Sequence, residues 1–392
     1  MRRARRRLSV GIALLCVAAL TGPAYAAGDT AAAAAPGGVI SAQQMTVYAD
    51  PAKLIAAPVA AWKVLYGSTS ATGEAIAVSG AILVPKTAWT GPGERPIIGY
   101  SVGTHGMGDQ CAPSYQLGQG TETEFGKMNL LLQQGWAVAV TDYENLGTPG
   151  THTYVVGRSE GHAALDVVRA AAHTPGAGLS ASAPVGLWGY SQGGQSTGWA
   201  AQYAARYAPE LNVKAAAAGG VPADFLRVSR SADGGPAAGL VLDSYLGYDA
   251  AYPALQLDKY LNDAGRVAMT DLQDDCVTDA VAKYALRPIS DFTTSAPLDT
   301  AAWQARFDDN RLGGTAKPSM PVYLYHGLVD EVVPYDQAAQ LRREWCANGA
   351  NVTWADYPGE HLTAWEEAVP VAAVWMRSRL AGEPTSGTCD LP

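Results

Sequence analysis

The sequence predicts an α/β fold in which a mostly parallel sheet is covered by helices on both faces. Short apolar strands alternate with longer amphipathic stretches, 48% of the 392 residues are hydrophobic, and only 16% are charged. Alternating strands and helices imply crossover connections between parallel strands, and this composition can fill a large core. The chain is therefore neither a disordered tail nor a collagen-like repeat.

The first 26 residues are expected to be an export signal. Five arginines lie within residues 2–7, an apolar run follows over residues 8–20, and Ala24-Tyr25-Ala26 offers the small residues that signal peptidase requires. The run is shorter than the roughly 20 apolar residues that cross a bilayer, which argues against a membrane anchor. We predict a secreted protein cleaved near Ala26, exported by either the Sec or the Tat route. A flexible leader rich in Ala, Pro and Gly should follow over residues 27–38.

Charge and cysteine content narrow the classes of function. Lys and Arg number 27 against 36 Asp and Glu, and cleavage after Ala26 would remove arginines and no acid. Such an acidic chain offers no surface for a polyanion, so we exclude nucleic acid as a partner. Four cysteines would remain in an oxidising compartment, which predicts two disulfides with three pairings open: Cys111, Cys276, Cys346 and Cys389. Because the sequence contains no Cys-x-x-Cys or His-Glu-x-x-His segment, we expect no metal and no cofactor.

The predicted elements fall into two parts of one core. The first part, residues 39–220, should hold strands over 75–84, 96–102, 136–141, 184–188 and 213–218, with helices ending at 134 and spanning 162–173 and 192–207. The second part, residues 318–392, should hold strands over 321–325 and 352–357 and helices over 335–348 and 362–380. Between them the alternation stops over residues 221–317, which we interpret as an inserted cap.

One pentapeptide, Gly189-Tyr190-Ser191-Gln192-Gly193, lies between an apolar strand and a helix. In that context Gly-x-Ser-x-Gly forms a tight, strained turn that projects the serine hydroxyl above the sheet. A second copy, residues 157–161, has only a short apolar run before it and charged neighbours beside Ser159. We therefore favour Ser191 as a nucleophile and interpret Ser159 as the N-cap of the next helix.

A serine nucleophile requires a base and an acid that orients the base. In the α/β-hydrolase fold these follow in the order Ser, acid, His, and only His326 and His361 come after Ser191. His361 follows the last predicted strand in a Gly/Pro-rich loop, so it is the expected base. Asp330 follows the preceding strand and is the expected acid, with Glu331 in reserve. His326 should hold this loop through a backbone hydrogen bond.

The oxyanion of a tetrahedral intermediate requires two preorganised N–H donors. The amide of Gln192, directly after the nucleophile, is the expected first donor. The second should come from the glycine-rich segment 103–109 after an early strand, where we nominate Thr104 or His105. The spacing of this segment resembles neither a dinucleotide nor a P-loop fingerprint.

Four segments resemble the secretory lipase family of α/β-hydrolases, and specifically its bacterial branch. They are residues 109–115 (DQCAPSY), 142–147 (DYENLG), 189–193 (GYSQG) and 219–222 (GGVP). The resemblance spans most of the chain after the signal. The fungal relatives place an acidic residue in the oxyanion loop where this chain has Gly103-Thr104-His105-Gly106, which leaves the second donor open.

The resemblance implies lipase or carboxylesterase activity and a helical cap over an acyl pocket. It implies the triad Ser191, Asp330 and His361. It also implies two disulfide pairings: Cys111 with Cys276, and Cys346 with Cys389. Ten apolar cap residues are candidates for the pocket lining: Leu240, Val241, Leu242, Tyr245, Leu246, Tyr248, Tyr252, Leu255, Leu257 and Tyr260.

Together these features predict a secreted serine hydrolase that cleaves carboxylic esters, such as acylglycerols, through an acyl-enzyme. Its substrate would be a small-molecule or lipid ester, with at most transient contact with a lipid interface and no obligate protein partner. Lipase and esterase activity remain open. The alternatives are a secreted peptidase on the same fold and a non-catalytic binding protein of hydrolase fold.

Overall fold

A nine-stranded sheet runs through residues 34–390, the part of the chain that the computed structural model describes. The strand order is β1-β2-β3-β5-β4-β6-β7-β8-β9. The first three strands and the β3–β5 pair are antiparallel, whereas all later neighbours are parallel. The strands are β1 (Val39–Met45), β2 (Val59–Thr69), β3 (Ala75–Pro85), β4 (Ile97–Ser101), β5 (Ala137–Thr141), β6 (Val185–Tyr190), β7 (Val213–Gly219), β8 (Val322–Gly327) and β9 (Val352–Tyr357).

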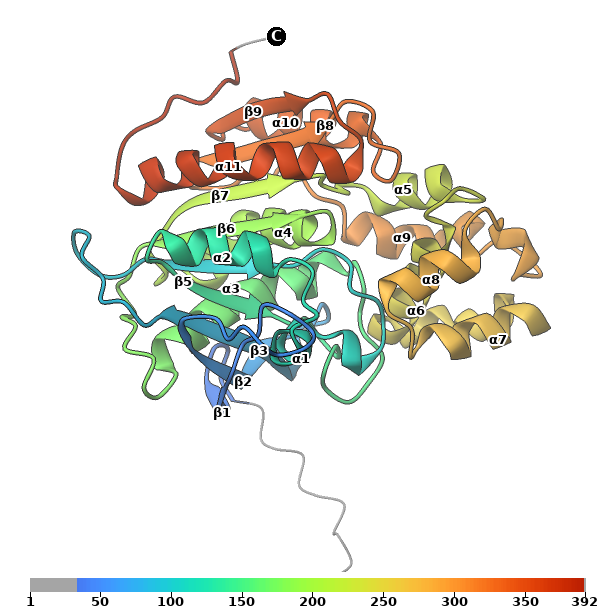
Figure 1. Ribbon diagram of the computed structural model, residues 1–392. Coiled ribbons are helices and arrows are strands. Elements are labelled where there is room, and N and C mark those ends of the chain that lie inside the picture. The colour runs from blue at the N-terminus through green and yellow to red at the C-terminus, as the bar shows by residue number, and fades with distance from the viewer. Residues whose placement is uncertain (1–33, 391–392) are drawn as a thin grey trace, which may run out of the picture. The chain divides into compact units, whose positions relative to one another are not determined.

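Helices cover both faces of this sheet (Figure 1). One face packs against α3, α4 and α10, and the other packs against α1, α2 and α11. The central parallel strands β4, β5, β6 and β8 are buried along their whole length, which explains why they are continuous apolar runs rather than alternating ones. The helices outside the cap are α1 (Pro113–Gln119), α2 (Phe125–Gln133), α3 (Gly157–His173), α4 (Gln192–Tyr207), α10 (Tyr335–Ala347) and α11 (His361–Leu380).

The cap is a separate group of helices inserted between β7 and β8. Its members are α5 (Phe225–Ala232), α6 (Ala238–Ala251), α7 (Asp263–Leu272), α8 (Val277–Tyr284) and α9 (Ala301–Asp309). In Figure 1 they gather at the right, the end toward which the arrows of the parallel strands point. They share their own apolar cluster, which includes the fully buried Trp303 and Tyr248. This cluster also includes Met107, Tyr154 and Val333 from the rest of the chain, so the cap packs onto loops at the carboxyl edge of the sheet, where loops carry function in open α/β sheets.

The predicted fold class is confirmed, and the differences lie at the edges of the sheet. The antiparallel strands β1 and β2 and the short helix α1 were not predicted. The expected signal peptide, residues 1–26, and residues 27–33 of the expected leader lie outside the described residues. At the end of that leader, Gly37 and Gly38 exchange backbone hydrogen bonds with Gly67 of β2. Within residues 34–390, no helix combines the length and the apolar character needed to span a membrane.

Candidate active site

Ser191 occupies a strained turn between β6 and α4. Its φ and ψ are 58° and −123°, a conformation that non-glycine residues rarely adopt. The turn is so tight that a Cβ at Gly189 would collide with the carbonyl of Gly193, and a Cβ at Gly193 would collide with the carbonyl of Ser101. Both glycines of the pentapeptide are thus required by close backbone approach, and Ser191 lies half-buried at the end of β6.

The second copy of the pentapeptide lies inside a helix. Residues 157–161 form the first turns of α3, and Ser159 is fully buried with its hydroxyl donating to the carboxylate of Glu144. The interpretation of Ser159 as a helix N-cap is wrong, because Val156 occupies that position and no side chain caps the helix. Ser159 is a core residue whose hydroxyl binds a buried carboxylate, and unlike Ser191 it does not lie in a turn between a strand and a helix.

Asp330 and His361 meet directly. Nδ1 of His361 lies 2.7 Å from Oδ2 of Asp330, and both side chains are almost fully buried. The other carboxylate oxygen, Oδ1, accepts hydrogen bonds from the backbone amides of Val332 (3.0 Å) and Val333 (2.7 Å). Burial alone would raise the pKa of Asp330, but the hydrogen bonds from His326 and His361 hold this pKa below its ordinary value. The carboxylate is therefore ionised and fixed in one orientation.

Glu331 and His326, the other candidates beside the Asp330–His361 pair, contact the backbone around it. Glu331 accepts a hydrogen bond from the backbone amide of His361 at 3.2 Å, so its contact is with the main chain of the histidine. His326 is fully buried, and its Nε2 lies 2.9 Å from the carbonyl of Val333 and 3.3 Å from Asp330. His326 thus ties together the loop that carries Asp330. His361 itself is the first residue of α11, which begins one residue earlier than the expected start at residue 362.

Tyr190 links the serine to the histidine. It immediately precedes Ser191, its hydroxyl donates to the carbonyl of His361 at 2.6 Å, and the two rings lie 5.0 Å apart. Ser191 and His361 share no hydrogen bond within residues 34–390. A hydrogen bond between nucleophile and base is often long without substrate and shortens in the reacting complex.

The expected oxyanion donors lie around Ser191. The amide of Gln192 begins α4, so it belongs to the first turn, whose N–H groups have no partner within the helix. A Cβ placed on Gly103 would lie 3.9 Å from the Cβ of Ser191, which puts the glycine-rich segment beside the serine. The amide of Gly103 donates to Glu124, whereas those of Thr104 and His105 donate to no acceptor in the described residues. Thr104 and His105 both remain available as the second donor.

A buried charged cluster lies behind this loop. The ring of His105 lies between the carbonyl of Gly103 (2.9 Å) and the carboxylate of Glu122 (3.0 Å). Burial alone would lower the pKa of His105, but its interaction with Glu122 raises this pKa to about 9, so the imidazole is protonated at neutral pH. Glu124 accepts from the Gly103 amide at 2.6 Å and from Tyr100 at 2.8 Å, and burial raises its pKa to about 7. The His105 side chain therefore fixes the loop from behind.

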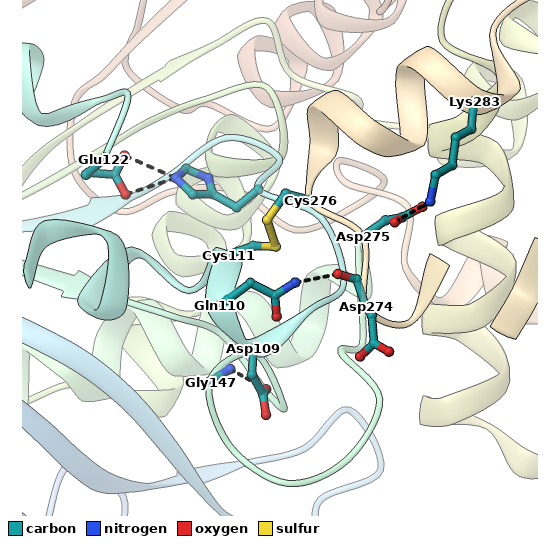
Figure 2. Close-up of a disulfide and its surroundings, with 10 residues drawn as sticks. Asp109, Gln110, Cys111, Glu122, Gly147, Asp274, Asp275, Cys276 and Lys283 are labelled. Atoms are coloured by element: carbon teal, nitrogen blue, oxygen red, sulfur yellow. Dashed lines mark hydrogen bonds and ion pairs between the residues drawn. A yellow bond between two sulfur atoms is a disulfide. The ribbon is translucent and has the colours of Figure 1, made fainter. Parts of the chain in front are cut away.

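The same loop is attached to the cap. Figure 2 shows the disulfide between Cys111, just after the loop, and Cys276, at the start of α8. The amides of Met107 and Gly108 both donate to the carbonyl of Asp275, and the amide of Val277 donates to the carbonyl of His105. The side chain of Gln110 donates to the carbonyl of Asp274. The second disulfide, Cys346–Cys389, lies away from this loop and joins α10 to the C-terminal segment.

A small apolar pocket is lined by Ser191 together with residues of α5 and α6 in the cap. Ser191 and Gln192 are its polar lining residues, and the remaining ones are apolar or aromatic: Tyr154, Val155, Pro222, Phe225, Val228, Ala232, Ala237, Leu240, Val241, Val332 and Val333. Of the ten cap residues considered from the sequence, Leu240 and Val241 line the pocket, while the others pack elsewhere in the cap. The pocket is narrow and largely enclosed by side chains from α5, α6 and the loop after β8.

A family model described as "Secretory lipase" matches residues 113–388 of this chain. The chain belongs to the secretory lipase family. This confirms the resemblance drawn from the four sequence segments. "Secreted triacylglycerol lipase LIP5" of Malassezia furfur is 31% identical over 77% of this chain and 82% of its own length. "Probable inactive lipase MT1628" of Mycobacterium tuberculosis (strain CDC 1551 / Oshkosh) is 32% identical over 84% of this chain and 76% of its own length.

Solved structures of a lipase and of an esterase have the same fold. Candida antarctica lipase A in its closed state superposes with a TM-score of 0.79 and 27% identity, covering 90% of this chain and 84% of that one. The rice cell wall degrading esterase LipA from Xanthomonas oryzae superposes with a TM-score of 0.70 at 22% identity, covering 89% of this chain and 99% of that one. The second likeness concerns the fold alone.

Sequence reasoning missed most of the pocket wall. Tyr154 and Val155 come from the loop before α3, and Val332 and Val333 come from the loop that carries Asp330. Nothing in their local pattern marks them, since they line the pocket only because distant segments meet at the carboxyl edge of the sheet. Glu160, whose carboxylate binds the side chain of Gln192, was also missed, although it lies in the second Gly-x-Ser-x-Gly.

Proposed function

We propose that this secretory lipase family member is a secreted serine hydrolase that cleaves carboxylic esters through an acyl-enzyme, with Ser191, His361 and Asp330 as its catalytic triad. The observation that carries the proposal is the Asp330–His361 pair, whose histidine contacts Tyr190, the residue before the strained Ser191 that lines an apolar pocket. A serine with a purely structural role would require neither the histidine–carboxylate pair nor the strained turn.

In the proposed reaction, His361 takes the proton of Ser191 as its Oγ attacks the ester carbonyl. Asp330 orients the imidazole and stabilises the imidazolium that forms. The amide of Gln192, with that of Thr104 or His105, stabilises the oxyanion. The intermediate collapses when His361 donates its proton to the leaving alcohol, and water then releases the acid from Ser191 by the reverse sequence.

The pocket supports an ester with an apolar acyl group. None of the described residues that line it has a charged side chain. An acyl chain would therefore be bound by burial of apolar surface. The cap helices that enclose it fit the lipid ester substrates of the family. The proposed secretion agrees with the names of relatives such as the secreted triacylglycerol lipase of Malassezia furfur.

The experiment that tests this function compares the wild type with Ser191→Ala and Ser159→Ala. A panel of p-nitrophenyl esters from acetate to long-chain acids should be hydrolysed by the wild type and by Ser159→Ala, whereas Ser191→Ala should lose at least about 10³-fold in kcat. A fluorophosphonate probe should label wild type and Ser159→Ala only. Absence of activity would also be informative, because one relative is named a probable inactive lipase. A folded wild-type protein that neither labels nor hydrolyses any ester would instead be a binding protein of hydrolase fold.

A further inference from the structure

The side chain of Gln192, the residue after the proposed nucleophile, is held by two partners. Its Nε2 donates to Oε1 of Glu160 at 2.8 Å and lies 3.3 Å from Nε2 of His152. Nδ1 of His152 lies 2.9 Å from the carbonyl of Glu144, so this nitrogen carries the proton and Nε2 is free to accept. Both amide hydrogens of Gln192 therefore have acceptors, which fixes the orientation of its side chain.

Glu160 also holds the wall of the pocket. Its Oε1 accepts the backbone amide of Val155 at 2.9 Å. Val155 lines the pocket next to Ser191 and has a φ of 53°, which is strained for a β-branched residue. A strained backbone persists only when its surroundings determine it, and the bond to Glu160 is one such restraint. One carboxylate oxygen thus connects the pocket wall to the residue after the nucleophile.

This connection is rigid because all its members are buried. Glu160 is 1% exposed, His152 is 1% exposed and Gln192 is 2% exposed. The ring of His152 lies between those of Tyr143 and Tyr154, with 6.0 Å between ring centres on each side. The hydroxyl of Tyr154 in turn lies 2.9 Å from Oγ1 of Thr104, one of the two candidates for the second oxyanion donor. The network therefore reaches from one expected donor segment to the other.

We propose that Glu160 is a positioning residue for the oxyanion hole, acting through the side chain of Gln192 and, through Val155, on the adjoining pocket wall. The inference rests on the proposed function, since it concerns the amide expected to bind the oxyanion. Gln192 follows the strained Ser191 in the chain, and its side chain is held by the hydrogen bond to Glu160. The direction of its N–H is thereby fixed before substrate binds, which is the condition for strong stabilisation of a developing charge.

The test uses two substitutions of similar volume. Glu160→Gln keeps an acceptor oxygen for Gln192 and Val155, whereas Glu160→Met keeps the bulk and removes the acceptor. We expect Glu160→Met to lower kcat on a p-nitrophenyl ester by about 10- to 100-fold with KM changed by less than about threefold, because misplacement of an oxyanion donor affects the transition state. Glu160→Gln should remain within about fivefold of the wild type. The rate of fluorophosphonate labelling should fall in parallel with kcat, because the phosphonyl oxygen enters the same site.

Asp166→Leu is the matched control. Asp166 is a fully buried carboxylate of the same helix that accepts hydrogen bonds from Ser68 and Tyr207 and, within the described residues, shares none with Gln192, His152 or Val155. It should lower the thermal midpoint by an amount similar to Glu160→Met and leave kcat within about threefold. Equal loss of kcat in both variants, or full activity in Glu160→Met, would overturn the proposal. Should Glu160→Met not fold, Gln192→Met tests the other end of the same hydrogen bond, with the same expected loss. An inactive, unlabelled wild type would refute the proposed function itself.

Discussion

Nδ1 of His361 lies 2.7 Å from Oδ2 of Asp330, while Glu331, the next residue, binds only the backbone amide of the same histidine. Two adjacent carboxylates thus hold the ring and the main chain of one residue. The difference arises because Oδ1 of Asp330 accepts the amides of Val332 and Val333, which turns Asp330 back into its own loop. Among the described residues, only Asp330 binds Nδ1 of His361 and can select the tautomer of its imidazole.

Substitution of the two carboxylates should therefore have unequal effects. Asp330→Asn would present an amide to Nδ1 and disturb the tautomer that a general base needs, so we expect kcat to fall by about 10³- to 10⁴-fold. Glu331→Gln preserves an acceptor for the His361 amide and should cost less than about tenfold. Steady-state kinetics on one soluble ester would measure both. A larger loss from Glu331→Gln than from Asp330→Asn would exchange the roles of the two residues.

The sequence was sufficient for the parts of this protein that depend on local pattern. Apolar runs predicted the buried parallel strands, and the strand-turn-helix context distinguished Ser191 from Ser159, which the structure places in different surroundings. The pairing of Asp330 with His361 follows from chain order, since parallel strands bring their carboxyl ends to one edge. These features can be predicted from the periodicity of apolar residues and the topology of the fold alone.

The remaining features depend on three-dimensional contacts that no local pattern encodes. Val332 and Val155, more than 170 residues apart in the chain, line one pocket because their loops converge beside Ser191. Glu160 binds Gln192 because α3 packs closely against α4. Strands β1 and β2 were missed because they come before the alternation of strands and helices begins; β1 is the partly exposed edge strand, and the more buried β2 pairs with it.

The two disulfides should differ in their effect on activity. Each closes a loop, and removal of either is expected to cost about 2–4 kcal/mol of unfolding free energy. Cys111–Cys276 also fastens the proposed oxyanion loop, residues 103–109, to the cap, whereas Cys346–Cys389 fastens the C-terminal segment to α10. We expect Cys111→Ser/Cys276→Ser to lower kcat by at least about tenfold more than Cys346→Ser/Cys389→Ser. Kinetics below the unfolding transition of both variants would measure this, and equal losses would show that the clamp does not influence the site.

The pocket wall predicts a change in preference for acyl chains. Ala237 lines the pocket, so Ala237→Phe should block its inner part and lower kcat/KM for an octanoate ester by about tenfold relative to acetate. Ala268→Phe is a suitable control, because Ala268 is buried in the cap core and does not line the pocket. Both substitutions overpack the cap and should destabilise it by about 1–3 kcal/mol. If the ratio of octanoate to acetate activity changed equally in both variants, this pocket would not determine the preference for acyl chains.

The buried carboxyl of Glu160 should make stability depend on pH. Burial raises its pKa from 4.5 to about 8, against the lowering effect of its hydrogen bonds from Gln192 and Val155. Between these two values the unfolded chain releases the proton and the folded chain keeps it, so stability contributed by this group is lost as the pH rises from about 5 to 8. Glu160→Gln cannot ionise at this position, so its free energy of unfolding, measured by urea titration, should rise relative to the wild type across that interval by at most about 1.4 kcal/mol per pH unit.

Glu344 provides the opposite case for the same measurement. Burial alone would raise the pKa of Glu344, but hydrogen bonds from Gln340, Gly314 and Arg311 hold this pKa below its ordinary value. Its contribution is complete above the unfolded pKa and is lost only as the pH falls further, so Glu344→Gln should differ from the wild type by a constant amount between pH 5 and 8. If the difference between wild type and Glu160→Gln were equally constant, Glu160 would be ionised in the folded protein throughout, and the carboxylate would hold Gln192 as a charged acceptor.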